Sequence, residues 1–172
     1  MNILVRKATV KDVIPLALLA RVTFREAFGH LFHNNENLIS YFAKSFSIEA
    51  LTKKLNDDNN VYWLAFLDNL PVGYAKLIKN SPSKFIEDEK VSELQRIYVL
   101  NDFLNRKIGH LLQNEIFEEV KRIESNYLWL SVYVDNPKAI RFYERYGYHK
   151  LGTHIFGILN QNFEFSVMSK AF

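Results

Sequence analysis

The chain has 172 residues, of which 48% are hydrophobic and 24% are charged, and it contains no cysteine. This composition is typical of a folded globular domain, and it excludes disulfides, thiol catalysis and cysteine-based metal sites. The formal net charge of +3 is too small to argue for a nucleic acid partner. The N-terminal region has no apolar stretch long enough for a signal peptide or a membrane span, so we expect a cytoplasmic protein without a membrane partner.

Glycine is scarce, with six residues in the whole chain and no two of them within four positions of each other. Loops that cradle phosphates usually need clustered glycines, because glycine lets several backbone N–H groups converge on one anion. A Walker-type P-loop and a GxGxxG dinucleotide turn are therefore excluded.

The first half of the chain begins with a short predicted strand over residues 3–5. Thr9 is a candidate N-cap, and Asp12 stands where it completes a variant of the capping box. Apolar residues then recur at helical spacing over residues 13–28. Two further helical patterns follow, one around residues 38–42 and one that begins at Ser47.

The pattern then changes to that of strands. Two β-rich runs, 61–67 and 72–78, are joined by the turn signal Asp68-Asn69 and predict a hairpin. A polar loop is expected over 80–90 and a strand over 94–99, and a helix begins at Ile108. The last predicted elements are a strand over 127–134, a helix that begins at Asn136-Pro137 and ends at Gly147, and two strands over about 148–158 and 163–168.

A strand, a helix and a second strand in this order imply a right-handed crossover between parallel strands. The flanking hairpins imply antiparallel neighbours. Because the chain has no internal repeat and no linker-like segment, we predict one domain over residues 1–172, an α/β (α+β) fold with a mixed, twisted sheet.

Three places can carry chemistry. The junction between Leu100 and Leu112 places a helix start next to Arg106, Lys107 and His110, which suits an anion, although a solvated basic turn explains it as well. Asn136 and Tyr143 lie two helical turns apart on one face, or are an N-cap and a buried core aromatic. Glu93 is either a general base or an exposed strand residue.

These segments together resemble a known family. The strand RIYVL, the basic loop that ends in Ile108-Gly109, the strand LWLSVYV and the segment DNPKAIRFYERYGY are similar to the GNAT superfamily of acyl-CoA-dependent N-acetyltransferases. The resemblance implies a GNAT-like mixed, twisted sheet of about seven strands flanked by helices, with splayed parallel strands 4 and 5. TFREAFGHLF, SIEALTKKL and GTHIFGILNQNFEFSVMSK look similar to PaiA-like spermidine/spermine acetyltransferases.

The resemblance also implies roles for residues, with acetyl-CoA as co-substrate and no metal. Tyr143 would protonate the departing thiolate, and Glu93 matches the general base of some members. The cofactor-binding residues implied are Ile97, Tyr98, Val99, Leu104, Asn105, Arg106, Lys107, Ile108, Gly109, His110, Asn136, Ala139, Phe142 and Tyr143.

The pyrophosphate loop departs from the family pattern Gln/Arg-x-x-Gly-x-Gly/Ala. Leu104 stands at the first polar position and Lys107 at the first glycine, and only Gly109 remains. A lysine can serve there if its φ is negative, because the donor to the phosphate is a backbone N–H that lysine also has.

The favoured function is acetyl transfer from acetyl-CoA to a primary amine of a small molecule, by direct attack in a ternary complex. A polyamine is one candidate acceptor, for which Glu26, Glu36 and Glu49 would supply carboxylates, although each alone also fits a solvated helix surface. The alternatives are a protein or peptide N-acetyltransferase and a non-catalytic acyl-CoA-binding regulatory module. A homodimer is compatible with the sequence, which does not fix the oligomeric state.

Overall fold

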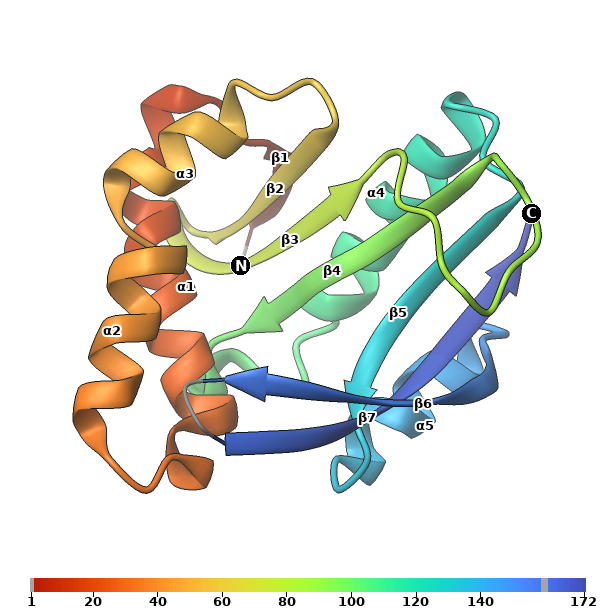
Figure 1. Cartoon of the computed structure of the whole chain (residues 1–172). Helices are drawn as coiled ribbons and strands as arrows, with labels where there is room; N and C mark the ends of the chain where they lie inside the picture. The colour runs from red at the N-terminus through yellow and green to blue at the C-terminus, as the bar shows by residue number, and fades with distance from the viewer. Residues whose placement is uncertain (1, 159–160) are drawn as a thin grey trace. The chain divides into compact units, whose positions relative to one another are not determined.

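The computed structural model describes residues 2–158 and 161–172, and Figure 1 shows its elements. In chain order these are β1 (Ile3–Lys7), α1 (Val13–Phe28), α2 (Asn35–Ser45), α3 (Ile48–Leu55), β2 (Asn60–Leu67), β3 (Leu70–Ile78), β4 (Val91–Val99), α4 (Ile108–Arg122), β5 (Tyr127–Tyr133), α5 (Pro137–Arg145), β6 (His149–Ile158) and β7 (Gln161–Ala171). Every predicted element is present, and β4 begins three residues earlier than the predicted 94. Residues 1, 159 and 160 lie outside the described residues, and the predicted domain range 1–172 includes them.

The strands pair in the order β1-β2-β3-β4-β5-β7-β6. β1 runs antiparallel to β2, with Ile3 opposite Leu67, and β7 is antiparallel to both β5 and β6. β4 and β5 are parallel and are joined through α4, as the crossover argument predicts. The α/β fold with a mixed seven-stranded sheet flanked by helices is therefore confirmed.

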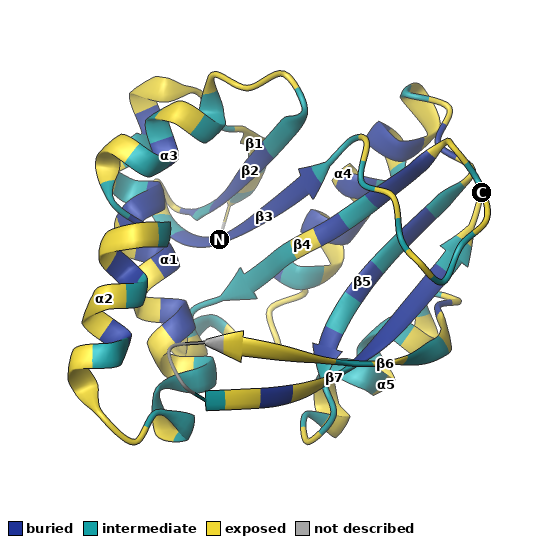
Figure 2. Ribbon diagram, in the orientation of Figure 1, coloured by how far each residue is buried: buried dark blue, intermediate teal, exposed yellow. Residues whose placement is uncertain are grey.

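The chain divides into two compact units. The first comprises Met1–Leu77 and Arg96–Glu118, and in it α1, α2 and α3 gather beside β1, β2 and β3 (Figure 1). The strands β2 and β3 are almost continuously buried (Figure 2), as expected for apolar runs that are covered on both faces.

Local signals explain why these elements form where they do. The Thr9 N–H donates to Asp12 Oδ2 at 2.9 Å, which closes the start of the first helical segment. Ser47 caps α3 by accepting the Ala50 N–H at 3.1 Å. Asp68 and Asn69 turn the β2–β3 hairpin with φ values of 47° and 69°, and these two residue types tolerate the left-handed region better than most.

The second unit comprises Ile78–Gln95 and Glu119–Phe172, and it holds β5, β7, β6, α5 and the first half of β4. β5 alternates between buried and half-buried residues, with Leu128, Leu130 and Val132 in the core. β6 is largely exposed (Figure 2). Within this unit, the 79–90 loop packs against β6 through Phe85, since a side-chain carbon added at Gly152 would lie 2.6 Å from the Phe85 ring.

Across the described residues, every helix is too short or too polar to cross a lipid bilayer.

Candidate functional site

The second half of β4 carries the residues that the family resemblance assigns to the cofactor. Ile97, Tyr98 and Val99 are all half-buried. Gly73 of β3 lies so close to them that an added side-chain carbon would stand 2.8 Å from the Tyr98 carbonyl oxygen. A side chain at position 73 would therefore displace the backbone of this segment.

The parallel ladder between β4 and β5 consists, in the described residues, of three pairs: Val91 with Tyr127, Ser92 with Leu128, and Glu93 with Trp129. All three lie at the beginning of the two strands. Strands that stop pairing after a short ladder leave backbone N–H and C=O groups for another partner.

The loop after β4 begins with a short 3-10 helix, Asn101–Phe103, and then exposes every residue from 104 to 107. Its first residue is tied to α1, because the Asn101 N–H donates to Glu26 Oε2 at 3.1 Å. Asn105 and Lys107 both have a φ of 62°. The condition of a negative φ at Lys107 is therefore not met: the lysine takes the left-handed conformation, which costs an L-residue about 1 kcal/mol.

Helix α4 starts directly after this loop. Its first helical hydrogen bond runs from the Leu111 N–H to the Lys107 C=O at 3.1 Å. The N–H groups of Ile108 and Gly109 precede that bond, and the Lys107 side chain has no acceptor atom to cap them. The buried Ile108 anchors the helix start while His110 is exposed beside it. Backbone donors, the positive end of the helix dipole and three basic side chains make this junction suitable for a phosphate group.

The start of α5 is built differently. Asn136 Oδ1 accepts the Ala139 N–H at 3.1 Å, and Gly147 ends the segment with a φ of 85°. Asn136 is thus the N-cap that one interpretation of the sequence predicted. Phe142 and Tyr143 are half-buried, unlike the buried core aromatics of that interpretation.

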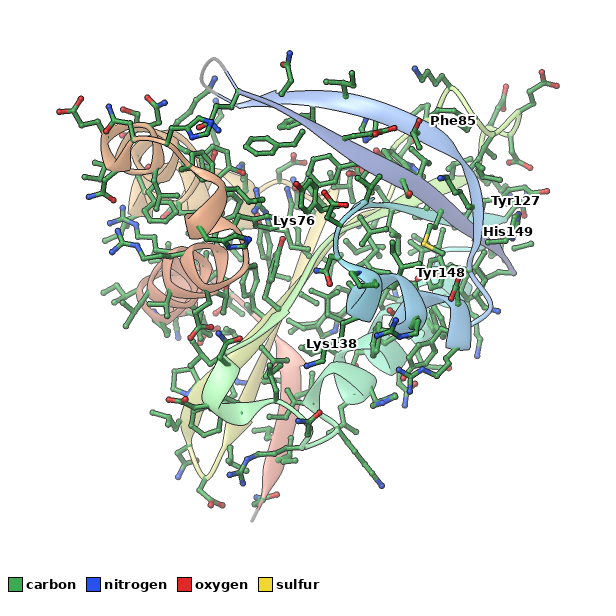
Figure 3. The ribbon with its side chains drawn as sticks, turned by 90° about the horizontal axis from the view of Figure 1, so that it is seen from below. Lys76, Phe85, Tyr127, Lys138, Tyr148 and His149 are labelled. Atoms are coloured by element: carbon green, nitrogen blue, oxygen red, sulfur yellow. The ribbon has the colours of Figure 1, made fainter. Side chains whose placement is uncertain are left out.

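Tyr143 is held by aromatic neighbours of its own unit. Its ring centroid lies 5.4 Å from that of Phe142 and 5.6 Å from that of Tyr148. Tyr148 is buried next to this helix (Figure 3). The position of the Tyr143 ring is therefore fixed by packing, although the side chain is not enclosed in the core.

Glu93 is half-buried, and it lies in a cluster of polar side chains that the sequence did not predict. The Ser81 hydroxyl donates to Glu93 Oε2 at 2.8 Å. On β5, Ser131 Oγ lies 2.9 Å from His154 Nε2. Glu93 pairs with Trp129, and Ser131 is two residues further along, so these side chains share one face of the strands. A Ser–His pair separated by 23 residues leaves no sequence pattern that identifies it.

The three glutamates proposed for a polycationic acceptor have separate local partners. Glu26 is bonded to the Asn101 N–H, and Glu36 lies 3.5 Å from Asn34 Nδ2 within its own helix cap. Glu49 is exposed in the first turn of α3. None of their contacts joins one of them to another.

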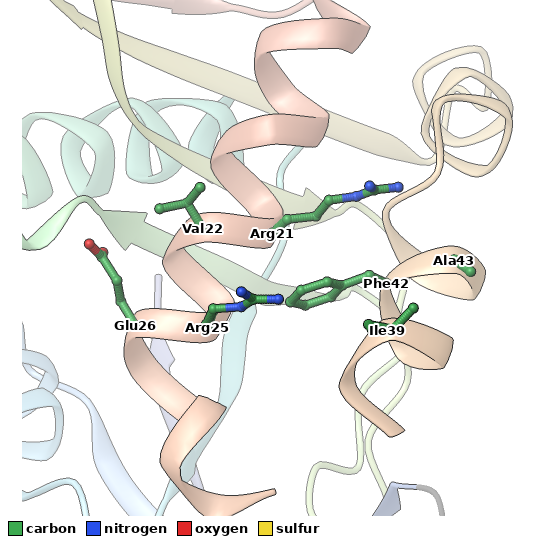
Figure 4. Close-up of a pocket in the computed structure, with 7 residues that line it drawn as sticks. All are labelled: Arg21, Val22, Arg25, Glu26, Ile39, Phe42 and Ala43. Carbon is green, nitrogen blue, oxygen red and sulfur yellow. The ribbon is translucent and has the colours of Figure 1, made fainter. Parts of the chain in front are cut away.

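A surface pocket of about 460 Å³ lies between α1 and α2 in the first unit (Figure 4). The Arg25 side chain points toward Phe42 across it, with the guanidinium carbon 5.8 Å from the ring centroid. The lining residues are Arg21, Val22, Arg25, Glu26, Ile39, Phe42 and Ala43, so two cations and one carboxylate surround an apolar floor.

Two buried or half-buried cations on apolar strands were also missed by the sequence analysis. Lys76 of β3 is only 3% exposed and lies among the packed side chains of its unit (Figure 3). Arg96 of β4 is half-buried and donates from Nη2 to the Tyr41 hydroxyl at 3.2 Å. A charged residue inside an otherwise apolar strand was the available signal. Among the described residues, no group of three or more His, Asp or Glu side chains is arranged to hold a metal ion.

The family model of the acetyltransferase (GNAT) family matches residues 25–148 of this chain. This protein is a member of the GNAT family. It is thus an N-acetyltransferase by family, and the matched range includes β4, the basic loop, α4 and the whole Asn136–Gly147 segment.

Relatives of this GNAT protein agree with that assignment. An uncharacterized N-acetyltransferase of Lactobacillus delbrueckii subsp. lactis is 25% identical over 146 residues, which cover 85% of this chain and 84% of the relative. Among solved structures, the PaiA N-acetyltransferase from Thermoplasma acidophilum in complex with coenzyme A has a TM-score of 0.76 at 21% identity, with both chains covered fully. A ribosomal-protein-alanine N-acetyltransferase from Brucella melitensis has a TM-score of 0.70 at 20% identity, over 98% of this chain and 99% of that one. These structural similarities show the shared fold.

Proposed function

We propose that this GNAT protein uses acetyl-CoA to acetylate the primary amine of a small molecule, within a single catalytic domain. The observation that carries the proposal is the start of α4, where the preceding Lys107 has no side-chain acceptor to cap the helix, behind an exposed basic loop and directly after β4. The PaiA relative that was solved with coenzyme A supports the choice of cofactor.

The cofactor has three proposed contact regions. The backbone of Ile97, Tyr98 and Val99 pairs with the pantetheine arm in place of a neighbouring strand. The loop and helix start from 104 to 110 hold the pyrophosphate, with backbone N–H groups as donors and Arg106 and Lys107 as nearby cations. Asn136, Ala139, Phe142 and Tyr143 of the α5 segment complete the binding residues.

The chemistry needs two protons to leave the amine nitrogen and one proton to reach the thiolate. The substrate ammonium first loses a proton to become a nucleophilic amine, and Glu93 is the proposed acceptor. The amine nitrogen then attacks the thioester carbonyl, so that a C–N bond forms and the C–S bond breaks. A backbone N–H of β4 stabilises the oxyanion. Tyr143 donates its proton to the departing thiolate, which leaves as CoA-SH. Glu93, after passing its first proton to solvent, accepts the second amine proton, and that proton returns through solvent to the Tyr143 phenolate, so that one proton is released per turnover.

The hydrogen-bonded pair of Ser131 and His154 is a second candidate for the base, because it lies on the same strand face as Glu93. Replacing each with a neutral isostere separates the two. Glu93→Gln lowers kcat/KM at least tenfold on the proposed mechanism, and His154→Gln lowers it by less. The opposite order assigns the base to His154.

The acceptor class has two leading alternatives, a polyamine and the N-terminus of a peptide. The PaiA and ribosomal-protein-alanine relatives, which have almost equal similarity to this chain, support one each. A non-catalytic acyl-CoA-binding module is the third alternative, since the pyrophosphate loop keeps only one of its family glycines.

A calorimetric titration with acetyl-CoA and an assay of amine-dependent CoA release test the proposal together. We expect saturable acetyl-CoA binding, and CoA release that depends on at least one amine in a panel of polyamines, amino acids, amino alcohols and short peptides. Binding without CoA release from any acceptor supports the regulatory module. Absence of binding at millimolar acetyl-CoA contradicts the proposed function.

A further inference from the structure

The surroundings of Arg96 bear on which amine the protein accepts. Arg96 directly precedes Ile97, so its Cα lies about 3.8 Å along the strand from the segment proposed for the acetyl end of the cofactor. Its Nη2 donates to the Tyr41 hydroxyl at 3.2 Å, and its guanidinium carbon lies 4.6 Å from the Phe46 ring centroid. Both partners belong to the α2 region, and both are neutral.

Two more neutral phenols, Tyr74 and Tyr98, lie near enough for the Arg96 charge to act on their pKa values. Burial raises the pKa of Tyr74 to about 12, with the Arg96 charge acting in the opposite direction, and it raises the pKa of Tyr98 further. Both phenols are therefore protonated at neutral pH. The charge of Arg96 is solvated by hydroxyl dipoles and an aromatic face, without a carboxylate among its described partners.

More positive charge lies close by. Burial lowers the pKa of Lys54, and the Arg96 charge lowers it further, which shows that the two cations are near enough to repel. Lys76 places its Nζ 5.5 Å from the Tyr62 ring centroid in the interior of the same unit. Tyr62 is itself a buried phenol with a raised pKa.

A buried hydroxyl lies beside the Arg96 charge. Tyr74 is 1% exposed, its hydroxyl makes no hydrogen bond of ordinary length and angle among the described residues, and the nearby Arg96 charge acts to lower its pKa. Tyr74 and Arg96 thus present donors of one kind, suited to an oxyanion.

We propose that the acceptor amine carries a second, anionic group, a carboxylate or a phosphate, that binds to the Arg96 guanidinium. This inference rests on the proposed function. A buried guanidinium is stabilised most by an oxyanion that accepts two of its parallel N–H donors. Residue 96 as a whole is half-buried. An acceptor with several positive charges would instead be repelled by Arg96 and Lys54.

The test is a series of primary amines of equal chain length, assayed by CoA release with saturating acetyl-CoA. The far end of the series carries a carboxylate (6-aminohexanoate), a phosphate (6-aminohexyl phosphate), a hydroxyl (6-aminohexanol) or a second ammonium (1,6-diaminohexane). We expect kcat/KM for the better anionic amine to exceed that of the hydroxyl compound at least tenfold, and the diamine to be the poorest. The carboxylate and phosphate arms identify which anion is preferred.

Substitutions of Arg96 then test whether this residue causes the preference for anionic amines. Arg96→Gln is expected to reduce the anion-to-hydroxyl ratio of kcat/KM to about one, mainly through KM, and Arg96→Lys is expected to keep part of it. A purely structural role would lower kcat/KM for all four amines together and leave the ratio unchanged. Arg25→Gln is the matched control, because Arg25 is an exposed arginine of the same unit that also faces a phenylalanine ring.

Different results would overturn the anionic acceptor and the acetyltransferase function. Equal or better turnover of the diamine, or a ratio that survives Arg96→Gln, overturns the anionic acceptor and leaves the acetyltransferase intact. Lack of acetyl-CoA binding overturns the proposed function itself. Calorimetry of the acetylated products keeps the inference testable if a variant turns over slowly: N-acetyl-6-aminohexanoate should bind the wild-type protein more tightly than N-acetyl-6-aminohexanol, and equal affinities would contradict the inference.

Discussion

The starts of α4 and α5 are built in opposite ways. At α5, the Asn136 side chain accepts the Ala139 N–H, and Pro137 removes another donor that a helix start would leave unpaired. At α4, the preceding residue is a lysine with a left-handed backbone, and the donors of Ile108 and Gly109 have no side-chain cap from it. The N-cap of α5 thus accepts a backbone N–H within the protein, whereas the residue before α4 leaves the N–H groups of Ile108 and Gly109 for another acceptor.

The two helix starts serve different purposes: the start of α5 contributes to folding stability, and the start of α4 keeps backbone donors for a ligand. A capped helix start contributes about 1 kcal/mol to folding, and its donors are then unavailable to a ligand. The start of α4 follows two left-handed, non-glycine residues and receives no such contribution from the Lys107 side chain, which leaves its backbone donors for another acceptor. The proposed pyrophosphate site therefore lies at a helix start that is less stabilised than that of α5. The proposed acid Tyr143 belongs to α5, whose start is capped.

The largest expected effect concerns Tyr143. Tyr143→Phe removes the proposed proton donor and keeps the aromatic packing, so kcat should fall about 100-fold or more while the affinity for acetyl-CoA changes little. Tyr146→Phe on the same helix is the control and should keep the wild-type rate. An unchanged rate of CoA release in Tyr143→Phe shows that Tyr143 is not the acid.

The start of α1 shows how much a capped helix start contributes to stability, because the contribution of Asp12 depends on pH. The hydrogen bond from Arg6 lowers the pKa of Asp12 from 3.8 to about 2, together with the bond from the Thr9 N–H and against burial. A depressed folded-state pKa means that the stabilisation is present above about pH 4 and is lost as the pH falls toward 2.

Asp12→Asn should therefore lower the free energy of unfolding by about 1–2 kcal/mol at pH 7, and the difference from wild type should shrink below pH 4. Urea unfolding at several pH values measures it. Asp58→Asn, at an exposed position, is the control and should have little effect at any pH. A difference that stays constant down to pH 2 would mean that the Asp12 charge is not the cause.

Two substitutions at Asn136 should separate its role as the N-cap of α5 from its proposed contact with the cofactor. Asn136→Ala removes the acceptor of the Ala139 N–H and should cost about 1 kcal/mol of stability, whereas Asn136→Ser keeps a capping oxygen and should cost a few tenths. Both variants lose the amide proposed to contact the pantetheine, so both should raise the Kd for acetyl-CoA. If Asn136→Ser binds acetyl-CoA as tightly as wild type, Asn136 serves only as a cap.

The smallest effect is expected at Lys107. Lys107→Gly relieves the left-handed strain, so we expect a gain of about 0.5–1 kcal/mol in stability and an acetyl-CoA affinity that is equal or better. Lys107→Ala keeps the strain and removes the cation, so it should bind acetyl-CoA a few-fold more weakly. Weaker binding by Lys107→Gly than by Lys107→Ala would contradict a functional role for the backbone of this loop.

Much of this architecture follows from local sequence signals. The cap at Ser47, the turn at Asp68-Asn69 and the helix boundaries at Asn136 and Gly147 were all predicted, because each depends on residues that are neighbours in the chain. The left-handed conformation of Lys107 was not predicted. Local preference favours a negative φ for lysine, and here the path from the loop into α4 overrides it.

The contacts that most refine the function join distant parts of the chain. Arg96 and Tyr41 are 55 residues apart, and Ser131 and His154 are 23 apart. Residue types and spacing cannot reveal such pairs, because their proximity depends on strand register and helix packing. Glu93 was identified as a candidate from its position in the strand, but its bond to Ser81 required the structure.

The central claim, that the start of α4 holds the cofactor's pyrophosphate, is tested most directly by backbone-amide NMR. Coenzyme A and pantetheine, which lacks the pyrophosphate, are titrated into the same labelled protein. The account predicts that coenzyme A shifts the amide signals of Ile108 and Gly109 strongly and that pantetheine leaves them nearly unchanged. Signals of Ile108 and Gly109 that do not move at saturating coenzyme A would contradict it.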